Sequence, residues 1–298
     1  MIDTVIKEFP VSEAGAGPYG VTTGPDGASW LTLVHAGGVA RMSVDGEVRT
    51  WSLGAPESRP LIITPGPDDA LWFTRSGDDR IGRISTAGEL SSVALPPGTG
   101  PCGITTGPDG ALWYAGMNSD TVGRVTTDGA ATTFALPVAG AFASMMAPGP
   151  DETVWCTLNQ ANALARVDMA GGVTVHPLPT ANAGPVGISG SADGGLWFVE
   201  ILAGQLGRID PDGRIREYAL PDRSARPHAI VGDAVGGAWF TEWGGNRIGH
   251  VDVAGRIETY DLPTPNSEPH GLTVAPDGTV WAALEIGRLA RLTPPPQV

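Results

Sequence analysis

The sequence predicts an all-β protein, a seven-bladed β-propeller with four antiparallel strands in each blade. Tryptophan recurs at a nearly constant interval along the chain, and no stretch shows the roughly 3.6-residue periodicity of an amphipathic helix. Seven of the nine tryptophans form this series: Trp30, Trp72, Trp113, Trp155, Trp197, Trp239 and Trp281, with steps of 42, 41, 42, 42, 42 and 42 residues. One four-stranded unit cannot bury both of its faces, whereas seven units packed in a ring can.

The elements follow in the same order within each repeat. A first strand begins twelve residues before the tryptophan, at a proline that is replaced only by Ala143. A turn such as Pro25-Asp26-Gly27 then leads to the tryptophan strand, because proline presets φ and glycine accepts positive φ. A third strand such as 81–84 and a fourth such as 215–220 complete the unit. We expect the tryptophans to pack between blades, since a function would not need seven copies.

The two ends of the sequence predict how the ring closes. The seventh repeat stops after residues 289–292 and lacks a fourth strand, while residues 5–10 resemble the fourth strands of the other repeats. We therefore predict that the N-terminal strand completes the C-terminal blade, which removes a sheet edge. The whole chain, residues 1–298, is then a single domain.

Composition narrows the class of partner. The chain carries 18 Lys and Arg against 32 Asp and Glu, a formal charge of −14, so we expect neither nucleic acid nor anionic membrane as a partner. No apolar run approaches the roughly 18 residues of a membrane span, and the first residues do not read as a signal peptide. Cys102 and Cys156 alone suggest neither a disulfide scaffold nor a zinc site. We expect a soluble, cytoplasmic monomer, because a closed ring has no open sheet edge that demands a partner.

Positions that differ between repeats are the candidates for function. The residue after the proline should line the central channel near one mouth, and around the ring these residues are Tyr19, Leu61, Cys102, Ser144, Val186, His228 and His270. Four carboxylates fall near the same mouth: Glu200, Glu242, Glu268 and Glu285. Because the ring makes repeat one the neighbour of repeat seven, the reactive side chains should be contiguous.

These residue types allow two interpretations. Grouped carboxylates repel one another, which raises a pKa or recruits a cation, and one or two carboxylates with water suit Mg²⁺ better than zinc. The alternative is a hydrogen-bond network with no catalytic role. His35, His176 and His250 fall on loops or outer strands, so we expect them to be structural or solvated.

Several segments together resemble the streptogramin B lyase (virginiamycin B lyase) family over essentially the whole chain. They are Gly17-Pro18-Tyr19-Gly20, Trp197-Phe198-Val199-Glu200, Arg226-Pro227-His228-Ala229, the Trp-Phe-Thr-Glu-Trp-Gly run at 239–244, Glu268-Pro269-His270-Gly271 and Ala283-Leu284-Glu285. The resemblance implies a Mg²⁺-dependent carbon–oxygen lyase that gives antibiotic resistance. Its small-molecule substrates are type B streptogramins, cyclic depsipeptides that it linearises by elimination at the threonyl ester bond.

The resemblance also implies roles for individual residues. His270 would be the general acid and base, and Glu268 and Glu285 would hold Mg²⁺. Substrate-binding residues would be His228, Tyr19, Glu200, Glu242 and Trp243. Repeat four departs from the pattern at Ala143-Ser144 and repeat two at Arg75, which leaves the substrate range open.

Two other functions compete with a lyase. Propeller-type lactone hydrolases hold Ca²⁺ with Asn, Asp and Glu in the channel, and the channel ring here is poor in Asn and Asp. A non-catalytic interaction scaffold would bind without turnover and would be indifferent to His270.

Overall fold

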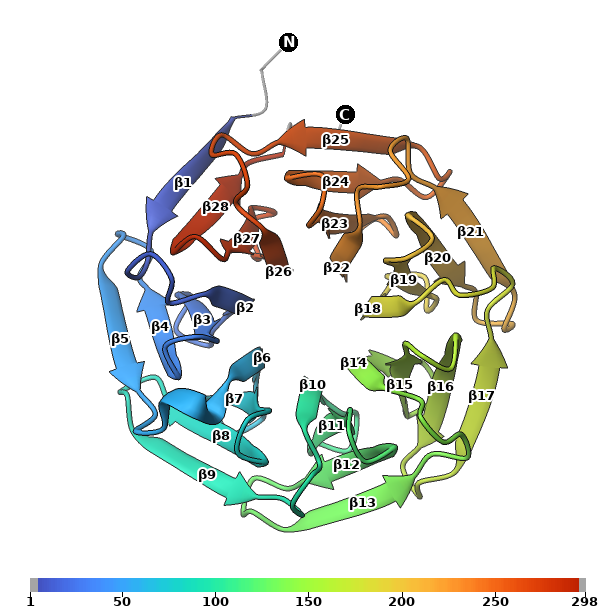
Figure 1. Cartoon of the computed structure of the whole chain (residues 1–298), viewed down its shortest axis with the longest axis horizontal. Helices are drawn as coiled ribbons and strands as arrows, with labels where there is room; N and C mark the ends of the chain where they lie inside the picture. Colours follow the sequence, from blue (N-terminus) through green and yellow to red (C-terminus); the bar gives the residue numbers. More distant parts are fainter. Residues whose placement is uncertain (1–4, 295–298) are drawn as a thin grey trace.

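Seven four-stranded antiparallel sheets stand around a central axis in the computed structural model, which describes residues 5–294 (Figure 1). Blades one to three are β2–β5 (Pro18–Thr23, Ser29–Leu33, Gly38–Met42, Val48–Ser52), β6–β9 (Pro60–Pro65, Ala70–Arg75, Arg80–Ser85, Leu90–Ala94) and β10–β13 (Pro101–Thr106, Leu112–Gly116, Thr121–Val125, Ala131–Ala135). Blades four to six are β14–β17 (Ala143–Gly149, Thr153–Leu158, Ala163–Asp168, Val173–Pro177), β18–β21 (Pro185–Gly190, Leu196–Glu200, Gln205–Ile209, Ile215–Ala219) and β22–β25 (Pro227–Gly232, Ala238–Glu242, Arg247–Val251, Ile257–Asp261). Blade seven joins β26–β28 (Pro269–Val274, Val280–Leu284, Arg288–Leu292) to β1 (Ile6–Pro10). A short 3₁₀ helix, η1 (Pro56–Ser58), precedes blade two. The predicted seven-bladed propeller is confirmed.

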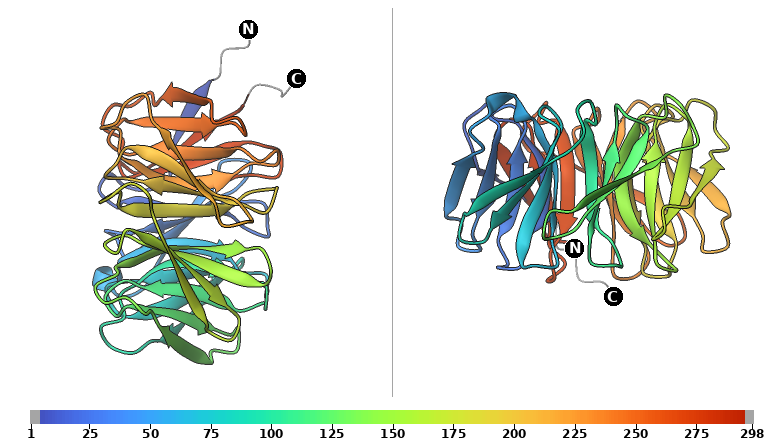
Figure 2. Two further views of the ribbon diagram at one scale, coloured as in Figure 1. Left: turned by 90° about the vertical axis from the view of Figure 1, so that its right-hand side faces the viewer. Right: turned by 90° about the horizontal axis from the view of Figure 1, so that it is seen from below.

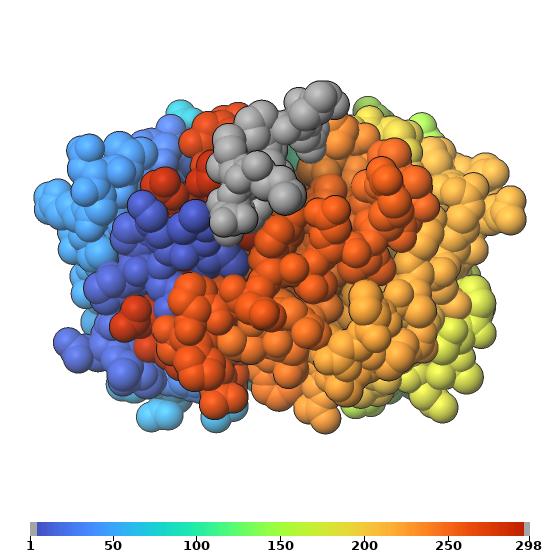
Figure 3. All heavy atoms as spheres, turned by 90° about the horizontal axis from the view of Figure 1, so that it is seen from above, coloured from blue at the N-terminus to red at the C-terminus, as the bar shows by residue number. Residues whose placement is uncertain are grey.

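The ring closes through the N-terminal strand, as predicted. β1 pairs antiparallel with β28, with Ile6 opposite Leu292 and Pro10 opposite Arg288. Figure 3 shows the blue N-terminal segment lying against the red and orange segments of the last blades. The Glu8 carboxylate adds a polar tie, because it accepts hydrogen bonds from the N–H (3.1 Å) and the hydroxyl (2.5 Å) of Thr264. Residues 1–4, which precede the closing strand, lie outside the described residues.

The apolar core lies between neighbouring blades. Trp30, Trp72, Trp113 and Trp197 are at most 1% exposed, and each packs in a cluster that draws on two adjacent sheets. Truncating such a buried tryptophan to alanine costs about 3–5 kcal/mol. The blades therefore stand side by side around the axis, with the first strand of each blade innermost (Figure 1), and seen from the side the ring forms a thick disc (Figure 2). The inner strands line a cavity on the axis.

A polar clamp repeats around the tryptophans of blades one, two and three. In blade one the Trp30 indole N–H donates to Asp26 Oδ1 (3.0 Å), and Arg41 Nε donates to Asp26 Oδ2 (2.7 Å) while its guanidinium lies 5.8 Å from the indole centroid. Blades two and three repeat the arrangement with Asp68, Trp72 and Arg83, and with Asp109, Trp113 and Arg124. The clamp arginine stands at the same position of the third strand in all three blades.

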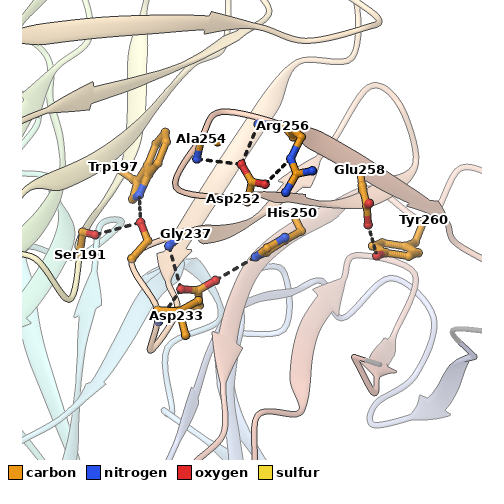
Figure 4. A network of polar contacts seen from close by, with 12 residues as sticks. Ser191, Trp197, Asp233, Gly237, His250, Asp252, Ala254, Arg256, Glu258 and Tyr260 are labelled. Atoms are coloured by element: carbon orange, nitrogen blue, oxygen red, sulfur yellow. Dashed lines mark hydrogen bonds and ion pairs between the residues drawn. The ribbon is translucent and has the colours of Figure 1, made fainter. Parts of the chain in front are cut away.

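Blade six has a histidine at the position of the clamp arginine, and this histidine pairs with Asp233, which stands six residues before Trp239 instead of four (Figure 4). His250 Nε2 lies 2.8 Å from Asp233 Oδ2, and its ring packs on Trp239 at 4.5 Å. Asp233 Oδ1 accepts the N–H groups of Val235 (2.9 Å) and Gly237 (2.8 Å). His250 is therefore a structural residue, as predicted.

Each inner strand starts with a β-bulge just after its first residue. In blade seven the register with β27 shifts between Pro269 and Leu272, and all seven blades show the same shift. A threonine ties the bulges of neighbouring blades together: the Thr241 hydroxyl accepts the Ala229 N–H (3.0 Å) and donates to the His270 carbonyl (2.8 Å). The strand bearing His270 is thus anchored to blade six. Within residues 5–294, no helix is long and apolar enough to cross a membrane.

Candidate active site

Three aromatic side chains from the bulges meet at one mouth of the channel. Tyr19 in β2 stacks on His270 in β26, with ring centroids 4.4 Å apart and planes at 29°. The Tyr19 hydroxyl lies 3.3 Å from Nε2 of His228 in β22. The two imidazoles meet edge to face at 4.9 Å, and both are buried, at 8% and 7% exposed. Ring closure brings Tyr19 of blade one next to His270 of blade seven, as the repeat argument requires.

Two carboxylates complete the cluster. Glu285 follows β27, and its Oε2 lies 2.5 Å from His270 Nε2. Glu268 stands just before β26 and is exposed. One ligand atom from each of Glu268, His270 and Glu285 lies within 4.8 Å of the others. The structure therefore brings together five residues that the sequence analysis selects: Tyr19, His228, Glu268, His270 and Glu285.

Glu268 is held at the mouth by a left-handed backbone. Its φ is +51°, a conformation that costs a non-glycine residue about 1–2 kcal/mol. Asn246 braces the preceding loop, because its Oδ1 accepts the Ser267 N–H (2.7 Å) and its Nδ2 donates to the Thr264 carbonyl (3.0 Å). The strained position is thus fixed by its surroundings.

Burial sets the protonation of the aromatic groups. Burial, reinforced by the nearby His270, lowers the pKa of His228 to about 3, so this imidazole is neutral at neutral pH. Burial also raises the pKa of Tyr19 above its usual value, with smaller contributions from Cys102 and Glu285. Tyr19 therefore keeps its proton and can donate it to His228 Nε2. These two residues can orient a ligand by hydrogen bonds, but they are poor proton acceptors at neutral pH.

Glu285 is ionised and has both oxygens engaged. The hydrogen bond from His270, opposed by burial and helped by His35, lowers the pKa of Glu285 to about 2. His270 Nδ1 is buried and makes no hydrogen bond within residues 5–294, so Nε2 is the nitrogen that faces the carboxylates. Of the two His270 ring nitrogens, Nε2 is therefore the one directed toward the mouth.

A cavity of about 600 Å³ opens beside this cluster, and we call it the mouth cavity. Its lining includes Leu202, Arg223, Arg226, Trp243, Asn246 and Glu268. The Arg226 guanidinium lies 5.5 Å from the Trp243 ring centroid, and Trp243 lies 6.5 Å from His270. A second cavity of about 200 Å³ continues down the channel below His228 and is lined mostly by apolar residues. Pockets that hold drug-sized ligands are commonly 300–1,000 Å³, so the mouth cavity is the candidate ligand site.

Glu200 and Glu242 lie behind the wall of the site. Both side chains are 0% exposed, and neither lines the mouth cavity or the channel cavity in the described part of the chain. Glu200 Oε2 accepts a hydrogen bond from Gln205 (2.7 Å), and Glu242 Oε2 pairs with Arg247 (2.5 Å). Burial raises the pKa of Glu200 to about 7 and moves that of Glu242 upward, against the effect of Arg247. Their positions suit a supporting role, whereas Trp243 is at the cavity surface.

The structure adds a residue that the sequence analysis treats as structural or solvated. His35 is 53% exposed, but its Nε2 lies 2.6 Å from Glu285 Oε1. This contact could have been predicted from the sequence, because ring closure makes repeats one and seven neighbours. His35 follows Trp30 by five residues and Glu285 follows Trp281 by four, so both lie in equivalent loops. The loops after the two tryptophans are neighbours across the closure.

Comparisons with known proteins agree with this geometry. A family model described as the Virginiamycin B lyase family matches residues 4–292. A virginiamycin B lyase of Saccharopolyspora erythraea is 53% identical over 50 residues, which are 17% of this chain and 17% of that protein, so the matched segment spans less than a fifth of the relative. A crystal structure of virginiamycin B lyase from Staphylococcus aureus superposes with a TM-score of 0.95 at 37% identity, covering 98% of this chain and 100% of that chain. A catalytically inactive histidine-to-alanine variant of the same enzyme, with quinupristin, gives a TM-score of 0.94 at 36% identity over 98% and 100% of the two chains.

Proposed function

Because the chain belongs to the virginiamycin B lyase family, we propose that it is a carbon–oxygen lyase that inactivates type B streptogramin antibiotics. It linearises the cyclic depsipeptide by elimination at the threonyl ester bond. The observation that carries the proposal is the cluster of Glu268, His270 and Glu285 at the edge of the mouth cavity. The quinupristin complex of the Staphylococcus aureus relative supports a substrate of this class.

In this reaction a base removes the α-proton of the threonyl unit, and the electron pair forms the Cα=Cβ double bond. The Cβ–O bond breaks, its electrons leave with the carboxylate, and the base releases the abstracted proton to solvent. No atom is added, so the product, counted as its neutral carboxylic acid, has the mass of the substrate. His270 is the base, since its Nε2 faces the mouth while Nδ1 is buried. A positioned imidazole contributes about 10²–10⁴-fold to such a proton transfer.

Glu268 and Glu285 are the proposed Mg²⁺ ligands. Two carboxylates and an imidazole converge within 4.8 Å, and at least Glu285 is ionised, so the donor set fits a hard cation that takes few protein ligands. A bound Mg²⁺ would polarise a carbonyl oxygen of the substrate and offset the negative charge that develops there. His270 Nε2 donates a hydrogen bond to the ionised Glu285 in this structure, so proton abstraction requires this carboxylate to move off the nitrogen and Nε2 to give up its proton first.

The remaining residues orient the substrate. Neutral His228 and the Tyr19 hydroxyl form one hydrogen-bonded unit beside His270, and Trp243 with Arg226 forms a stacked wall of the mouth cavity. We propose that His228, Tyr19 and Trp243 contact the depsipeptide. A monomeric state and a cytoplasmic location belong to the same proposal, and light scattering with cell fractionation checks both.

The test is incubation of the purified protein with a type B streptogramin, with Mg²⁺ or with EDTA, followed by mass spectrometry and ultraviolet spectroscopy. We expect a Mg²⁺-dependent product of unchanged mass with new dehydroamino-acid absorbance. His270→Ala should lose this activity, and His176→Ala, far out on β17, should keep it. A gain of one water would instead indicate a hydrolase, and binding without any product would indicate a scaffold.

A further inference from the structure

We propose that His35 is a positioning residue, which holds one oxygen of Glu285 so that the other oxygen faces His270 and the proposed cation site. Glu285 Oε1 lies 2.6 Å from His35 Nε2, and Oε2 lies 2.5 Å from His270 Nε2. The two histidines come from blades one and seven, which are adjacent only because the ring is closed. The inference rests on the proposed function for the role of Glu285.

The position of the His35 ring is built into the backbone. A Cβ at Gly17 would lie 2.4 Å from His35 Cδ2 and 2.9 Å from a Val34 methyl carbon, so the imidazole and its neighbour occupy the space that any other residue would fill. The loop is also tied down, because the Val34 N–H donates to the Gly17 carbonyl (2.8 Å) and the His35 N–H donates to the Ala16 carbonyl (3.1 Å). The backbone thus fixes where the His35 ring lies beside the first strand.

Blades three and five share this arrangement, because Asn118 and Leu202 lie over Gly100 and Gly184 as His35 lies over Gly17, but of the three only blade one places an imidazole there. The residue before the first strand has positive φ in every blade: Gly17, Arg59, Gly100, Phe142, Gly184, Arg226 and Glu268. In blades six and seven the position carries Arg226 and Glu268, which line the mouth cavity. In blade one the glycine leaves this place empty, and the imidazole of His35 fills it.

The physical effect is to restrict Glu285. A carboxylate that follows a strand end can rotate about its side-chain bonds, and a hydrogen bond to one oxygen removes most of that freedom. The other oxygen is then offered singly, to His270 in this structure and to a cation in the proposed holoenzyme. Hydrogen bonds of this kind orient metal-bound carboxylates, and their removal typically costs 10–100-fold in metal affinity or activity.

Three variants test the role. His35→Phe keeps a ring without a donor, and His35→Gln keeps an N–H at similar reach. His176→Phe is the matched control, because this histidine packs on Trp155 in blade four, away from the cluster. The readouts are the Mn²⁺ dissociation constant, measured by electron paramagnetic resonance of the unbound ion, competition by Mg²⁺, and kcat and KM for a type B streptogramin.

We expect His35→Phe to weaken Mn²⁺ binding roughly 10–100-fold and to lower kcat more than it raises KM. His35→Gln should recover most of both quantities, and His176→Phe should match the wild type. Equal Mn²⁺ affinity in His35→Phe and wild type overturns the inference, and so does a wild-type protein that binds no Mn²⁺. If wild type binds Mn²⁺ and His35→Phe binds it more weakly but neither forms product, the proposed function fails while the role of His35 stands.

Discussion

At the scale of single residues, burial and partners separate glutamates that look alike in the sequence. Glu285 is ionised between two imidazoles, and Glu268 is exposed on a strained backbone at the mouth. Glu200 is fully buried with a single hydrogen-bonded oxygen, and its Oε1 has no partner within residues 5–294. Only the first two are placed to meet a cation or a substrate.

Glu200 gives a prediction about pH. Burial raises its pKa to about 7 in the folded protein from a reference of 4.5, so the neutral carboxyl favours folding below about pH 4.5, and this contribution is lost as the pH rises through about 7. Glu200→Gln is neutral at every pH. We expect the variant to match the wild type near pH 4 and to be more stable at pH 8, by about 1–3 kcal/mol. Urea unfolding at the two pH values measures the difference.

The control for this experiment is Glu89→Gln, which neutralises an exposed carboxylate. It should leave the free energy of unfolding nearly unchanged at both pH values. If Glu200→Gln gains no stability at pH 8, the burial argument is wrong. The same variant checks the substrate contact expected from the sequence, since a raised KM would support that contact and an unchanged KM would support a role behind the wall.

Repeat spacing predicts where a residue sits on the ring, and this placed Tyr19, His228 and His270 at one mouth. It does not predict which way a side chain turns at the end of a strand. Glu200 and Glu242 each face a polar partner five residues later, Gln205 and Arg247, in the paired register of the next strand. That pairing could be read from the sequence only once the register was known.

At the scale of elements, the clamp around the tryptophans of blades one to three ties the second strand to the third. These blades use an arginine that carries its charge at any physiological pH, whereas blade six uses His250, which is charged only when protonated. The repeat pattern was enough to predict the strand order and the hairpin turns. It was not enough to predict the clamp, because the clamp joins side chains of a turn, a second strand and a third strand that are not contained in one short motif.

Blade six therefore offers a stabilising substitution. We expect His250→Arg to place a permanent positive charge beside Asp233 and Trp239, and to raise the free energy of unfolding by about 0.5–1 kcal/mol at pH 8. Urea unfolding at pH 8 measures the gain. The reverse change in blade three, Arg124→His, should destabilise, and a His250→Arg protein no more stable than wild type at pH 8 would refute the argument.

At the scale of the whole molecule, the closing strand supports both the ring and the site. β1 covers the edge of β28, and Glu8 holds Thr264, whose carbonyl accepts from the Asn246 side chain that braces the loop before Glu268. The closure was predictable because the seventh repeat lacks a strand and the N-terminus supplies one. The polar link to Glu268 was not, since it depends on side chains more than 250 residues apart.

Removing residues 1–10 should therefore weaken the fold and the site together. Loss of the partly buried Ile6 and Phe9 alone should cost about 3 kcal/mol or more, and β28 gains an open edge. Calorimetry should show a lower Tm, with Glu8→Ala between the truncation and the wild type. Glu47→Ala, on an exposed side chain, serves as the control, and an unchanged Tm after truncation would sink the closure model.

The cluster at the mouth draws on blade one, blade six and blade seven, so it straddles the seam where the two ends of the chain meet. A ribosome that has released residues 1–250 has made five complete blades and no working site, because Glu268, His270 and Glu285 are still to come. Tyr19 and His35 are synthesised early, but His270 and Glu285, which they contact, are synthesised near the end of the chain. The proposed chemistry therefore depends on the last blade, and a translation product that ends before Glu268 lacks the proposed base and both proposed metal ligands even where most of its blades have folded.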